Sequence, residues 1–530
     1  MAAPDHGAER GRDPAPGPGP EQRPGPIIGV LALGGILAAV MQTLVVPLIG
    51  DLPRIFNTSA SNASWVVTAT LLSAAVTTPI AGRLGDLHGK RRMLLVSTVP
   101  LTAGSVVAAV ATELPTMIAG RGLQGMGMGV VPLGISALRD LLPPERLGTA
   151  IALISASLGI GGALGLPFAS AIAEYGSWRT LFWVTAGLSL LVAVLIKLIV
   201  PAAEPPHRTG RRFDHVGAVG LGAALVALLL AVSKGADWGW GSAATLGLSA
   251  AAVLVLLLWG WWELRHHEPM VDLRATARPQ VLLTNAASIV VGFAMYASAL
   301  IVPQLMQLPE ETGYGLGRSM MEMGLLMAPA GLMMMLVAPV GGRLTTTSGP
   351  KVTLFLGGVV IAAGYGLSLF LMDAAWTLVL AMCVVNGGVG LAYGAMPALI
   401  MSAVPQSRTA AANSFNTLMR SIGTSVSAAV VGAVMSQMTV TTGGFTLPTE
   451  DAFRTGMLIG CGVAVVAALI TLTIPYRKPD EHPAATPLTQ TSPSTSPSTS
   501  PSASSGPSAS SGPSPSSSPT SPVSQEKSTS

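Results

Sequence analysis

The chain has 530 residues, of which half are hydrophobic and a tenth are charged, and its mean hydropathy is +0.59. These values lie far outside the range of a soluble globular domain of this length, so they predict an integral membrane protein. The formal net charge of +4 would suit a nucleic-acid partner in a soluble protein, but membrane topology explains these basic residues, spread over loops on one side, better.

The two ends of the chain differ in composition from everything between them. Residues 1–26 are rich in proline and glycine, and the apolar run that follows is too long for the core of a signal peptide. Residues 476–530 are mostly serine, proline, threonine and alanine. Such segments bury too little apolar surface to offset chain entropy, so we expect a disordered N-terminus and a disordered tail.

Apolar runs long enough to cross a membrane occur fourteen times. About 20 helical residues cross a hydrocarbon core that is about 30 Å thick. The runs cover residues 27–50, 64–82, 93–112, 114–138, 149–173, 179–200, 215–234, 244–263, 281–304, 318–342, 353–372, 375–402, 409–437 and 453–475. The sequence therefore predicts an all-α integral membrane protein with fourteen transmembrane helices.

The positions of the basic residues support this count. With both termini in the cytoplasm, 21 of the 29 lysines and arginines lie in cytoplasmic segments and five lie outside or at outer helix ends. The remaining three, Arg121, Lys197 and Arg420, fall within spans. A missed span would scramble this bias, so the sequence predicts a multi-pass protein of the cell membrane with both termini cytoplasmic.

Between the second and third spans the chain reads GRLGDLHGKRRM, Gly82 to Met93. Its basic residues indicate a cytoplasmic loop, and its glycines allow a sharp turn and a close approach of helices. A basic turn without any further role is one interpretation. The string also closely resembles the G-x-L-a-D-r-x-G-r-[RK]-x signature of the major facilitator superfamily, which makes it a candidate gating loop. The candidate residues are Gly82, Arg83, Leu84, Asp86, Gly89, Lys90 and Arg91.

Within that loop Asp86 is the single acid among four basic residues. We expect it to close a cytoplasmic gate by pairing with basic residues or with a helix N-terminus, rather than to bind substrate.

The fourth span places Arg121, Gln124, Gly125 and Gly129 on one helical face. Arg121 lies roughly two turns inside the membrane, where an unpaired charge is costly, so it should face the bundle or a water-lined cavity. Pairing with a backbone carbonyl is the alternative to a functional role. The string RGLQGMGMG resembles the R-x-x-q-G-x-g signature of the same superfamily, and this resemblance implies a part in proton transfer for Arg121.

The fifth span contains SLGIGGALGLPFAS, in which Gly161 and Gly165 are spaced for close helix contact and Pro167 can bend the helix. Packing alone explains this pattern. It also resembles the antiporter signature that ends in G-P-x-x-G-G, although Leu166 separates the last glycine from the proline and the following glycines are replaced. This departure makes the direction of transport less firmly indicated than the fold.

The stretch GGRLTTTSGPK, Gly341 to Lys351, partly repeats the gating loop between the tenth and eleventh spans. It carries Gly342, Arg343, Leu344 and Gly349 at the matching positions, and Thr346 at the position of the acid. The repeat falls eight spans later, as two six-helix halves separated by two extra helices would give. We therefore expect six-helix bundles over residues 27–200 and 281–475, joined by a linker with two additional helices over 201–280.

The thirteenth span carries a polar stripe, Asn413, Asn416, Arg420, Thr424 and Ser427, along one helical face. Lipid exposure would be expensive, so the stripe should face a helix interface or an aqueous cavity. Interhelical hydrogen bonding explains its serine, threonine and asparagine residues, whereas our hypothesis places Asn413, Asn416 and Arg420 in a central cavity. Further candidates for the substrate cavity are Gln42, Gln124, Asn285, Tyr296, Asn386 and Tyr393.

Proton coupling needs a membrane-embedded group that changes its charge, yet acids deep in the spans are almost absent. Fourteen-span drug:proton antiporters carry an acid in the first span, in a pattern like L-D-x-T-I-V, whereas this chain reads VMQTLV with Met41 at that position. Glu322 joins Arg121 as a proton-coupling candidate. Ser319, three residues earlier, also predicts a capping box for Glu322, which is the favoured interpretation.

The sequence contains no motif that indicates a cofactor or a catalytic site. Cys383 and Cys461 lie inside apolar runs, so neither a disulfide framework nor a metal site is predicted. The chain contains no G-x-x-x-x-G-K-[ST] loop and no evident catalytic cluster of histidine, serine and acid. We expect no enzyme activity and no cofactor.

Together these motifs resemble the fourteen-span drug:proton antiporter family of the major facilitator superfamily over about residues 27–475. The resemblance implies two bundles that rock around a midplane site and export a small amphipathic antibiotic or toxic metabolite in exchange for protons. The expected partners are the small-molecule substrate, protons and the lipid bilayer, with no nucleic acid, and the chain is expected to be a monomer. A metabolite facilitator or importer without proton coupling, and a non-transporting membrane receptor, remain as alternatives.

Overall fold

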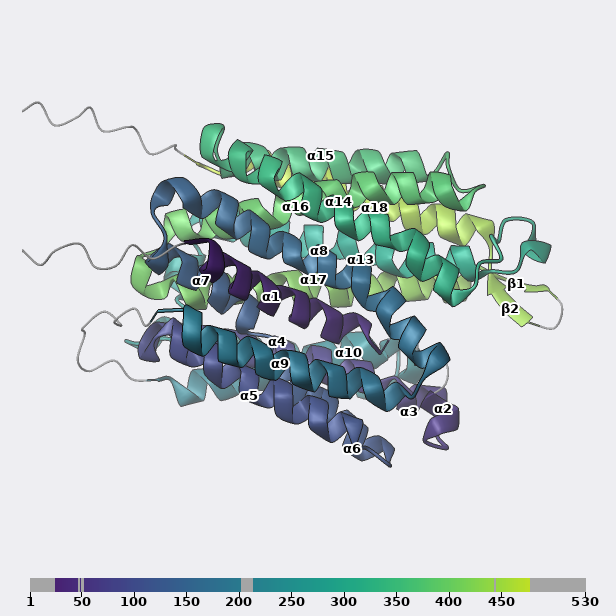
Figure 1. Cartoon of the computed structure of the whole chain (residues 1–530), viewed down its shortest axis with the longest axis horizontal. Helices are drawn as coiled ribbons and strands as arrows, with labels where there is room; N and C mark the ends of the chain where they lie inside the picture. Colours follow the sequence, from purple (N-terminus) through teal and green to yellow (C-terminus); the bar gives the residue numbers. More distant parts are fainter. Residues whose placement is uncertain (1–23, 46–47, 49–51, 202–212, 443–444, 477–530) are drawn as a thin grey trace, which may run out of the picture. The chain divides into compact units, whose positions relative to one another are not determined.

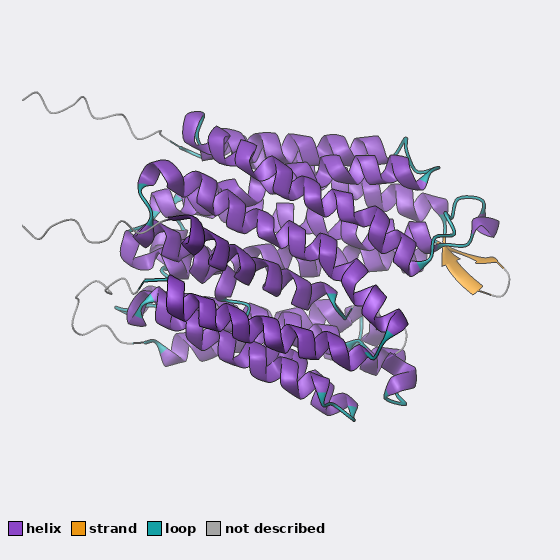
Figure 2. Cartoon of the chain, in the orientation of Figure 1, coloured by secondary structure: helices purple, strands orange, loops and turns teal. Residues whose placement is uncertain are grey.

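The computed structural model describes residues 24–45, 48, 52–201, 213–442 and 445–476, and most of them are helical. Helices are expected here, because in a hydrocarbon layer each backbone N–H and C=O must be satisfied within the chain. Figure 1 shows the long helices lying side by side, and Figure 2 shows a short β-hairpin at one end. The hairpin pairs its strands antiparallel, with Thr439 opposite Pro448.

The elements follow one another in this order. The helices are α1 (Pro24–Thr43), α2 (Leu52–Ile55), α3 (Ala60–Ala63), α4 (Trp65–His88), α5 (Lys90–Ala109), α6 (Leu114–Met126), α7 (Val130–Leu141), α8 (Pro144–Tyr175), α9 (Trp178–Ile199), α10 (His215–Trp238), α11 (Ala243–Arg265), α12 (Leu273–Thr276), α13 (Pro279–Gln307), α14 (Met320–Thr347), α15 (Pro350–Ser368), α16 (Ala375–Ala403), α17 (Thr409–Gln437) and α18 (Glu450–Thr473). Between them lie the 3-10 helices η2 (Glu310–Thr312) and η3 (Gln406–Arg408) and the strands β1 (Thr439–Thr442) and β2 (Phe445–Pro448).

Thirteen helices in the described part of the chain are long and apolar enough to cross a membrane. They match every predicted span except the fourth, residues 114–138, so a count of fourteen is not confirmed. The prediction of one continuous helix there is wrong, because the chain breaks between α6 and α7 at residues 127–129. Glycines disfavour the helix at this point. A Cβ on Gly127 would lie 2.5 Å from the carbonyl oxygen of Ser97, so the break also lets the backbone pack closely on α5.

Two predicted boundaries also change. Helix α1 ends at Thr43 rather than near residue 50, and residues 46–47 and 49–51 lie outside the described part. The stretch predicted as a loop, Gly82 to Met93, is helical on both sides of one residue, because α4 ends at His88 and α5 begins at Lys90. Gly89 makes that sharp junction with φ of +93°, a conformation that glycine adopts without strain.

The partial repeat has the same backbone geometry. Gly349 joins α14 to α15 with φ of +92°, as Gly89 joins α4 to α5. Both junctions therefore use a glycine at the matching position of the repeat, which supports the relation between the two stretches.

Buried apolar side chains gather mainly in two clusters. One is drawn almost entirely from α1 to α9, and the other from α13 to α18. A smaller cluster packs α10 and α11 against α4 and α17. These cores are compatible with the predicted division at residues 200 and 280, which stays our interpretation. Residues 1–23 and 477–530, and with them the predicted disordered ends, lie outside the described residues.

Candidate functional site

Helices α4 and α17 pack closely at the end of the bundle that the sequence assigns to the cytoplasm. A Cβ on Gly82 would lie 2.6 Å from Cβ of Ser414 and 2.7 Å from the carbonyl oxygen of Ala410. A Cβ on Gly85 would lie 3.6 Å from Cβ of Ala410. Glycine at these two positions therefore lets the backbone of α4 pack directly against the first turns of α17.

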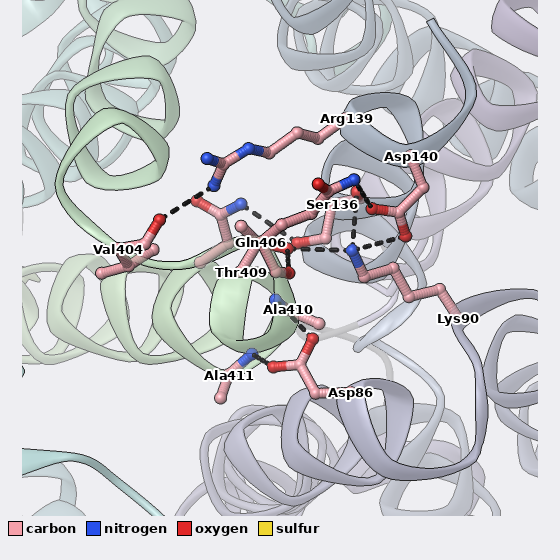
Figure 3. A network of polar contacts seen from close by, with 11 residues as sticks. Asp86, Lys90, Ser136, Arg139, Asp140, Val404, Gln406, Thr409, Ala410 and Ala411 are labelled. Atoms are coloured by element: carbon pink, nitrogen blue, oxygen red, sulfur yellow. Dashed lines mark hydrogen bonds and ion pairs between the residues drawn. The ribbon is translucent and has the colours of Figure 1, made fainter. Parts of the chain in front are cut away.

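Asp86 uses this approach to bond to the N-terminus of α17. Its carboxylate accepts hydrogen bonds from the backbone N–H of Ala410 at 3.1 Å and of Ala411 at 2.9 Å (Figure 3). Helix α17 has no acid in its first turn and no side-chain cap of its own. Asp86, which is 6% exposed, supplies the negative charge that a helix N-terminus favours, from a helix far away in the sequence.

Lys90, the first residue of α5, makes a second set of contacts beside Asp86. Its Nζ lies 2.7 Å from Oδ2 of Asp140, and it donates to the carbonyl oxygen of Ser136 at 3.1 Å and to Oγ1 of Thr409 at 2.9 Å. Figure 3 shows this ammonium between the end of α7 and the start of α17. Lys90 therefore joins three helices through one charge.

The segment before α17 bonds to the end of α7. Nε2 of Gln406 donates to Oδ1 of Asp140 at 3.1 Å, and Nη1 of Arg139 donates to the carbonyl oxygen of Val404 at 3.1 Å (Figure 3). We call the whole set the closed-end network. It consists of Asp86, Lys90, Ser136, Arg139, Asp140, Val404, Gln406, Thr409, Ala410 and Ala411.

The connection from α11 to α13 reinforces the same end. Arg83 of α4 forms an ion pair with Glu268 at 2.7 Å, and Arg408 of η3 forms one with Asp272. Arg83 is 3% exposed, and in the described part of the chain its Nε has no hydrogen-bond partner. The linker therefore touches both sides of the closed-end network.

The remaining residues of the gating loop have other surroundings. Nη2 of Arg91 donates to the carbonyl oxygen of Lys197 at 2.6 Å, near the end of α9. Leu84 is half-buried and packs against the core of the N-terminal helices. Gly89 turns the chain, as described above. The signature thus combines contacts to α17 with contacts inside the N-terminal helices.

Arg121 is buried, and its partners are neutral groups. Its Nη1 donates to the carbonyl oxygen of Met41 at 2.9 Å and to Oε1 of Gln124 at 2.6 Å, and its Nε donates to the carbonyl oxygen of Val66 at 3.3 Å. Nε2 of Gln124 continues the chain of bonds to Oγ of Ser105 at 2.8 Å. Arg121 thus bonds α6 to α1 and α4 through backbone carbonyl groups. Such pairing is the structural role that the sequence left open as an alternative to proton transfer.

Glu322 forms the capping box that Ser319 predicts. Its carboxylate accepts from the backbone N–H of Ser319 at 3.0 Å, and its own N–H donates to Oγ of Ser319 at 3.2 Å. The side chain is exposed at the start of α14. Arg121 and Glu322, the two proton-coupling candidates, are therefore not brought together.

The glycines of α8 pack against α1. A Cβ on Gly161 would lie 2.6 Å from the carbonyl oxygen of Ile36, and one on Gly165 would lie 3.4 Å from Cα of Val40. Pro167 lies inside α8, where Gly324 of α14 faces it. Helix α8 is thus held between α1 and α14, and its small residues serve close packing at both contacts.

Along α17 the polar stripe divides between different neighbours. Nδ2 of Asn413 donates to Oγ of Ser136 at 3.0 Å. Nδ2 of Asn416 donates to Oδ1 of Asn285 at 2.8 Å and to Oγ of Ser288 at 2.7 Å, both on α13. All of these side chains are buried, so the two asparagines on α17 join helices in this conformation.

Arg420, further along the same helix, lies over an aromatic ring. Its Cζ is 4.3 Å from the centroid of Tyr393 on α16, a cation–π distance. The hydroxyl of Tyr393 donates to Sδ of Met295 at 2.8 Å, and Oγ of Ser155 donates to the Tyr393 carbonyl oxygen at 3.0 Å. Ser155 belongs to α8, so this pair lies where the N-terminal and C-terminal helices meet.

The other cavity candidates lie apart from these groups. Gln42 is exposed near the end of α1, and Tyr296 is half-buried in α13. Nδ2 of Asn386 donates to the carbonyl oxygen of Met382, in its own helix, at 3.0 Å. Among the described residues, no hydrogen bond, ion pair or ring contact joins any of the three to Arg420.

Of the ten residues of the closed-end network, sequence reasoning named only Asp86 and Lys90. Asp140 and Arg139 are an ordinary pair of opposite charges at a predicted span end, and Gln406 and Thr409 lie in a short polar connection. The available signal was their position at ends predicted to be cytoplasmic. Arg139 and Asp140 directly follow the fourth span, and Gln406 and Thr409 lie at the start of the thirteenth.

Comparisons with known proteins agree with this architecture. The profile of the Major Facilitator Superfamily matches residues 31–428. The uncharacterized MFS-type transporter Rv1877 of Mycobacterium tuberculosis (strain ATCC 25618 / H37Rv) is 28% identical over 77% of this chain, and the chain spans 59% of that relative's length. The multidrug resistance protein Stp of the same strain is also 28% identical over 77% of this chain, and 76% of its own length is covered.

A solved structure has the same fold. The human organic anion transporter MFSD10 (TETRAN) superposes with a TM-score of 0.61 at 14% identity, over 85% of this chain and all of that one.

Proposed function

Because this chain belongs to the major facilitator superfamily, we propose that it exports small amphipathic compounds across the cell membrane by alternating access, in exchange for protons. Helices α6 and α7 together form the fourth span, which brings the number of spans to fourteen, and both termini lie in the cytoplasm. The N-terminal helices, α1 to α9, and the C-terminal helices, α13 to α18, form the two bundles that rock, with α10 and α11 at the periphery.

The closed-end network is the observation that carries this proposal. It bonds α4, α5 and α7 of one bundle to α17 and its preceding segment in the other. Asp86 bonds to the N-terminus of α17, and Lys90, Asp140 and Arg139 form hydrogen bonds to Thr409, Gln406 and Val404. These contacts between the bundles are short and polar, and they must break for that end to open. They are therefore suited to a reversible gate, whose closed form leaves the site accessible from outside.

The proposed class of exported compound is inferred from the name of a similar protein. Stp of Mycobacterium tuberculosis is named a multidrug resistance protein, and it is similar to this chain over most of the spans. Carried over to this chain, the name favours an antibiotic or a toxic metabolite as the exported compound.

A facilitator without proton coupling is the second candidate, and the surroundings of the coupling candidates favour it. Arg121 is bonded to neutral groups, and Glu322 is an exposed helix cap. Met41 occupies the position at which the antiporter pattern carries an acid.

Uptake into inverted membrane vesicles tests both candidates. Fluorescent cationic, neutral and anionic compounds are presented with a pH gradient, acid inside, and again after the gradient is collapsed. Export in exchange for protons predicts accumulation that needs the gradient. Equilibration of a compound across the membrane that does not depend on the pH gradient supports the facilitator instead. Uptake no greater than in vesicles without the protein, for every compound, would contradict transport altogether.

A further inference from the structure

The two arginines deepest in the described helices have opposite surroundings. Arg121 donates three hydrogen bonds, to Met41, Val66 and Gln124. Within the described ranges, the guanidinium of Arg420 donates no hydrogen bond and forms no ion pair, and its one close partner is the face of Tyr393. A guanidinium carries five N–H donors, so Arg420 keeps its full bonding capacity.

Arg420 also lies far from either membrane surface. It is the twelfth residue of α17, about 17 Å along a helix about 43 Å long. It is only half-buried, unlike Arg121, which is 1% exposed. A charge at this depth is stable only beside water or a counter-ion, so its accessible part should face a water-filled space rather than lipid.

The helix of Arg420 and two helices that contact this residue contain no acidic side chain. Helix α13, which Gly292 brings against the backbone of Arg420, contains no aspartate or glutamate, and neither do α16 and α17. The site is therefore a positive charge with hydrogen-bond donors available and with no ion-pair partner among the described residues.

We propose that Arg420 binds the anionic group of the transported compound, whose class is an organic anion with an apolar body. A carboxylate or sulfonate accepts a bidentate pair of hydrogen bonds from the edge of the planar guanidinium, while the ring of Tyr393 covers one of its faces. Met295, bonded to the Tyr393 hydroxyl, supplies apolar surface beside it. A lipid headgroup does not reach this depth, so the ligand is a small molecule. This inference rests on the proposed transport function and names its substrate class.

Equilibrium binding to the purified full chain tests the proposal. The probe is radiolabelled 1-naphthalenesulfonate, which stays anionic at all working pH values. The matched competitor is the trimethyl(1-naphthyl)ammonium cation, which has the same ring system and the opposite charge. We expect unlabelled 1-naphthoate to displace the sulfonate and the cation not to displace it. Displacement by the cation as effective as that by 1-naphthoate, or no saturable binding of the sulfonate, would overturn the proposal.

Variants connect the binding to Arg420. Arg420→Gln should weaken sulfonate binding at least about tenfold, because the charge-assisted bonds are lost. The affinity of Arg420→Lys for the sulfonate should lie between those of the wild type and Arg420→Gln, because lysine keeps the charge but lacks the planar pair of N–H donors. Arg318→Gln is the matched control, because Arg318 is an exposed arginine just before α14, and it should bind the sulfonate as the wild type does. Wild-type affinity in Arg420→Gln would refute the assignment.

Tyr393 gives an independent test if Arg420→Gln fails to fold. Tyr393→Phe keeps the ring under the guanidinium and should bind within about twofold of the wild type, whereas Tyr393→Leu should bind several-fold more weakly. Equal affinity in the two Tyr393 variants would count against the stacked arrangement. Binding that depends on Arg420 without any sulfonate transport in vesicles would refute the transport function while leaving the anion site intact.

Discussion

The carboxylate of Asp86 on α4 accepts a hydrogen bond from the backbone N–H of Ala411, in the first turn of α17, at 2.9 Å. The matching position in the repeat is Thr346 on α14, whose Oγ1 donates to the carbonyl oxygen of Arg343 in its own helix. Helix α14 approaches the start of α8, which begins with proline and carries Glu145 in its own first turn. The start of α8 needs no outside acid, whereas α17 lacks one, and this explains why only one copy of the repeat keeps it.

Asp86→Asn should favour opening of the end that carries the closed-end network. The amide keeps a hydrogen-bond acceptor but loses the charge that interacts with the helix N-terminus, so the closed form should lose about 1 kcal/mol, or about fivefold in population. Spin labels at exposed positions His88 and Pro405, in a chain without its free cysteines Cys383 and Cys461, report the change by pulsed electron resonance.

The matched control for this prediction is Thr346→Ala. It removes the side chain at the equivalent position of the repeat, where no bond to another helix is lost. The label distances should then stay those of the wild type. A distance distribution in Asp86→Asn that equals the control would contradict the role of Asp86 in closure. Closure that is lost in both variants would point to general loosening of the fold.

The ion pair between Lys90 and Asp140 should behave as a coupled unit. Their side chains are 9% and 21% exposed, and Nζ lies 2.7 Å from Oδ2, so the pair is shielded more than a surface pair. Lys90→Asp and Asp140→Lys should each shift the labels to longer distances. The double reversal should recover closure by at least about 1 kcal/mol of coupling. Reversals whose effects simply add would show that the two charges do not act on each other.

Much of this fold follows from one constraint that sequence displays directly. A span must be apolar over a fixed length, so the runs around α13, α16 and α17 fix those helices to within a few residues. The break between α6 and α7 is different, because the apolar run continues across it. Gly127 and Gly129 weaken the helix locally, but the close packing of Gly127 against Ser97, which belongs to another helix, has no trace in the local sequence.

The candidate site likewise contains features that the sequence predicts and features that only the packing of helices reveals. The sequence could name a helix N-terminus as a partner for Asp86, but it could not name Ala410 and Ala411, which lie 324 and 325 positions away. It could place Asn416 and Arg420 on one face of α17. Only the packing of α13 and α16 shows that the first is bonded to Asn285 and that the second is left with an aromatic face.

Arg121→Met should mainly destabilise the protein. It would leave the carbonyl oxygens of Met41 and Val66 and Oε1 of Gln124 without their donor in a buried place, at a cost of about 3 kcal/mol. Thermal unfolding in detergent should show a fall in Tm of several degrees, and Arg318→Gln should show none. A variant that keeps its Tm but loses the dependence of uptake on the pH gradient would instead establish Arg121 as a coupling residue.

Glu322→Gln should leave proton-dependent transport unchanged. Glutamine keeps an acceptor for the Ser319 N–H, and the side chain is exposed at the start of α14. Ser319→Ala should cost about 1 kcal/mol of stability, because it removes the other half of the capping box. Uptake in inverted vesicles with and without the pH gradient measures the first effect. Loss of gradient dependence in Glu322→Gln, with its Tm unchanged, would show that the carboxyl group carries protons.

The charge of the proposed substrate makes transport sensitive to membrane voltage. One elementary charge is worth about 2.3 kcal/mol per 100 mV, so an anion that crosses alone should reach about a 50-fold concentration ratio at 100 mV. Export of one anion in exchange for one proton moves two charges, so the ratio should be about 2,500-fold when the pH is equal on both sides. An anionic substrate therefore requires accumulation that follows the voltage in either case, and the size of the ratio separates the antiporter from the facilitator.

Proteoliposomes with a potassium gradient and valinomycin, positive inside, give this measurement with 1-naphthalenesulfonate. The ratio at equilibrium does not depend on how the protein is oriented, so mixed insertion does not disturb it. Arg420→Gln liposomes should fill more slowly than wild-type liposomes at low concentrations of the anion, because binding is weakened, but they should approach the same ratio. This follows because a carrier sets the rate of approach and the charge movement sets the end point. A ratio near one at 100 mV, with transport still active, would contradict an anionic substrate.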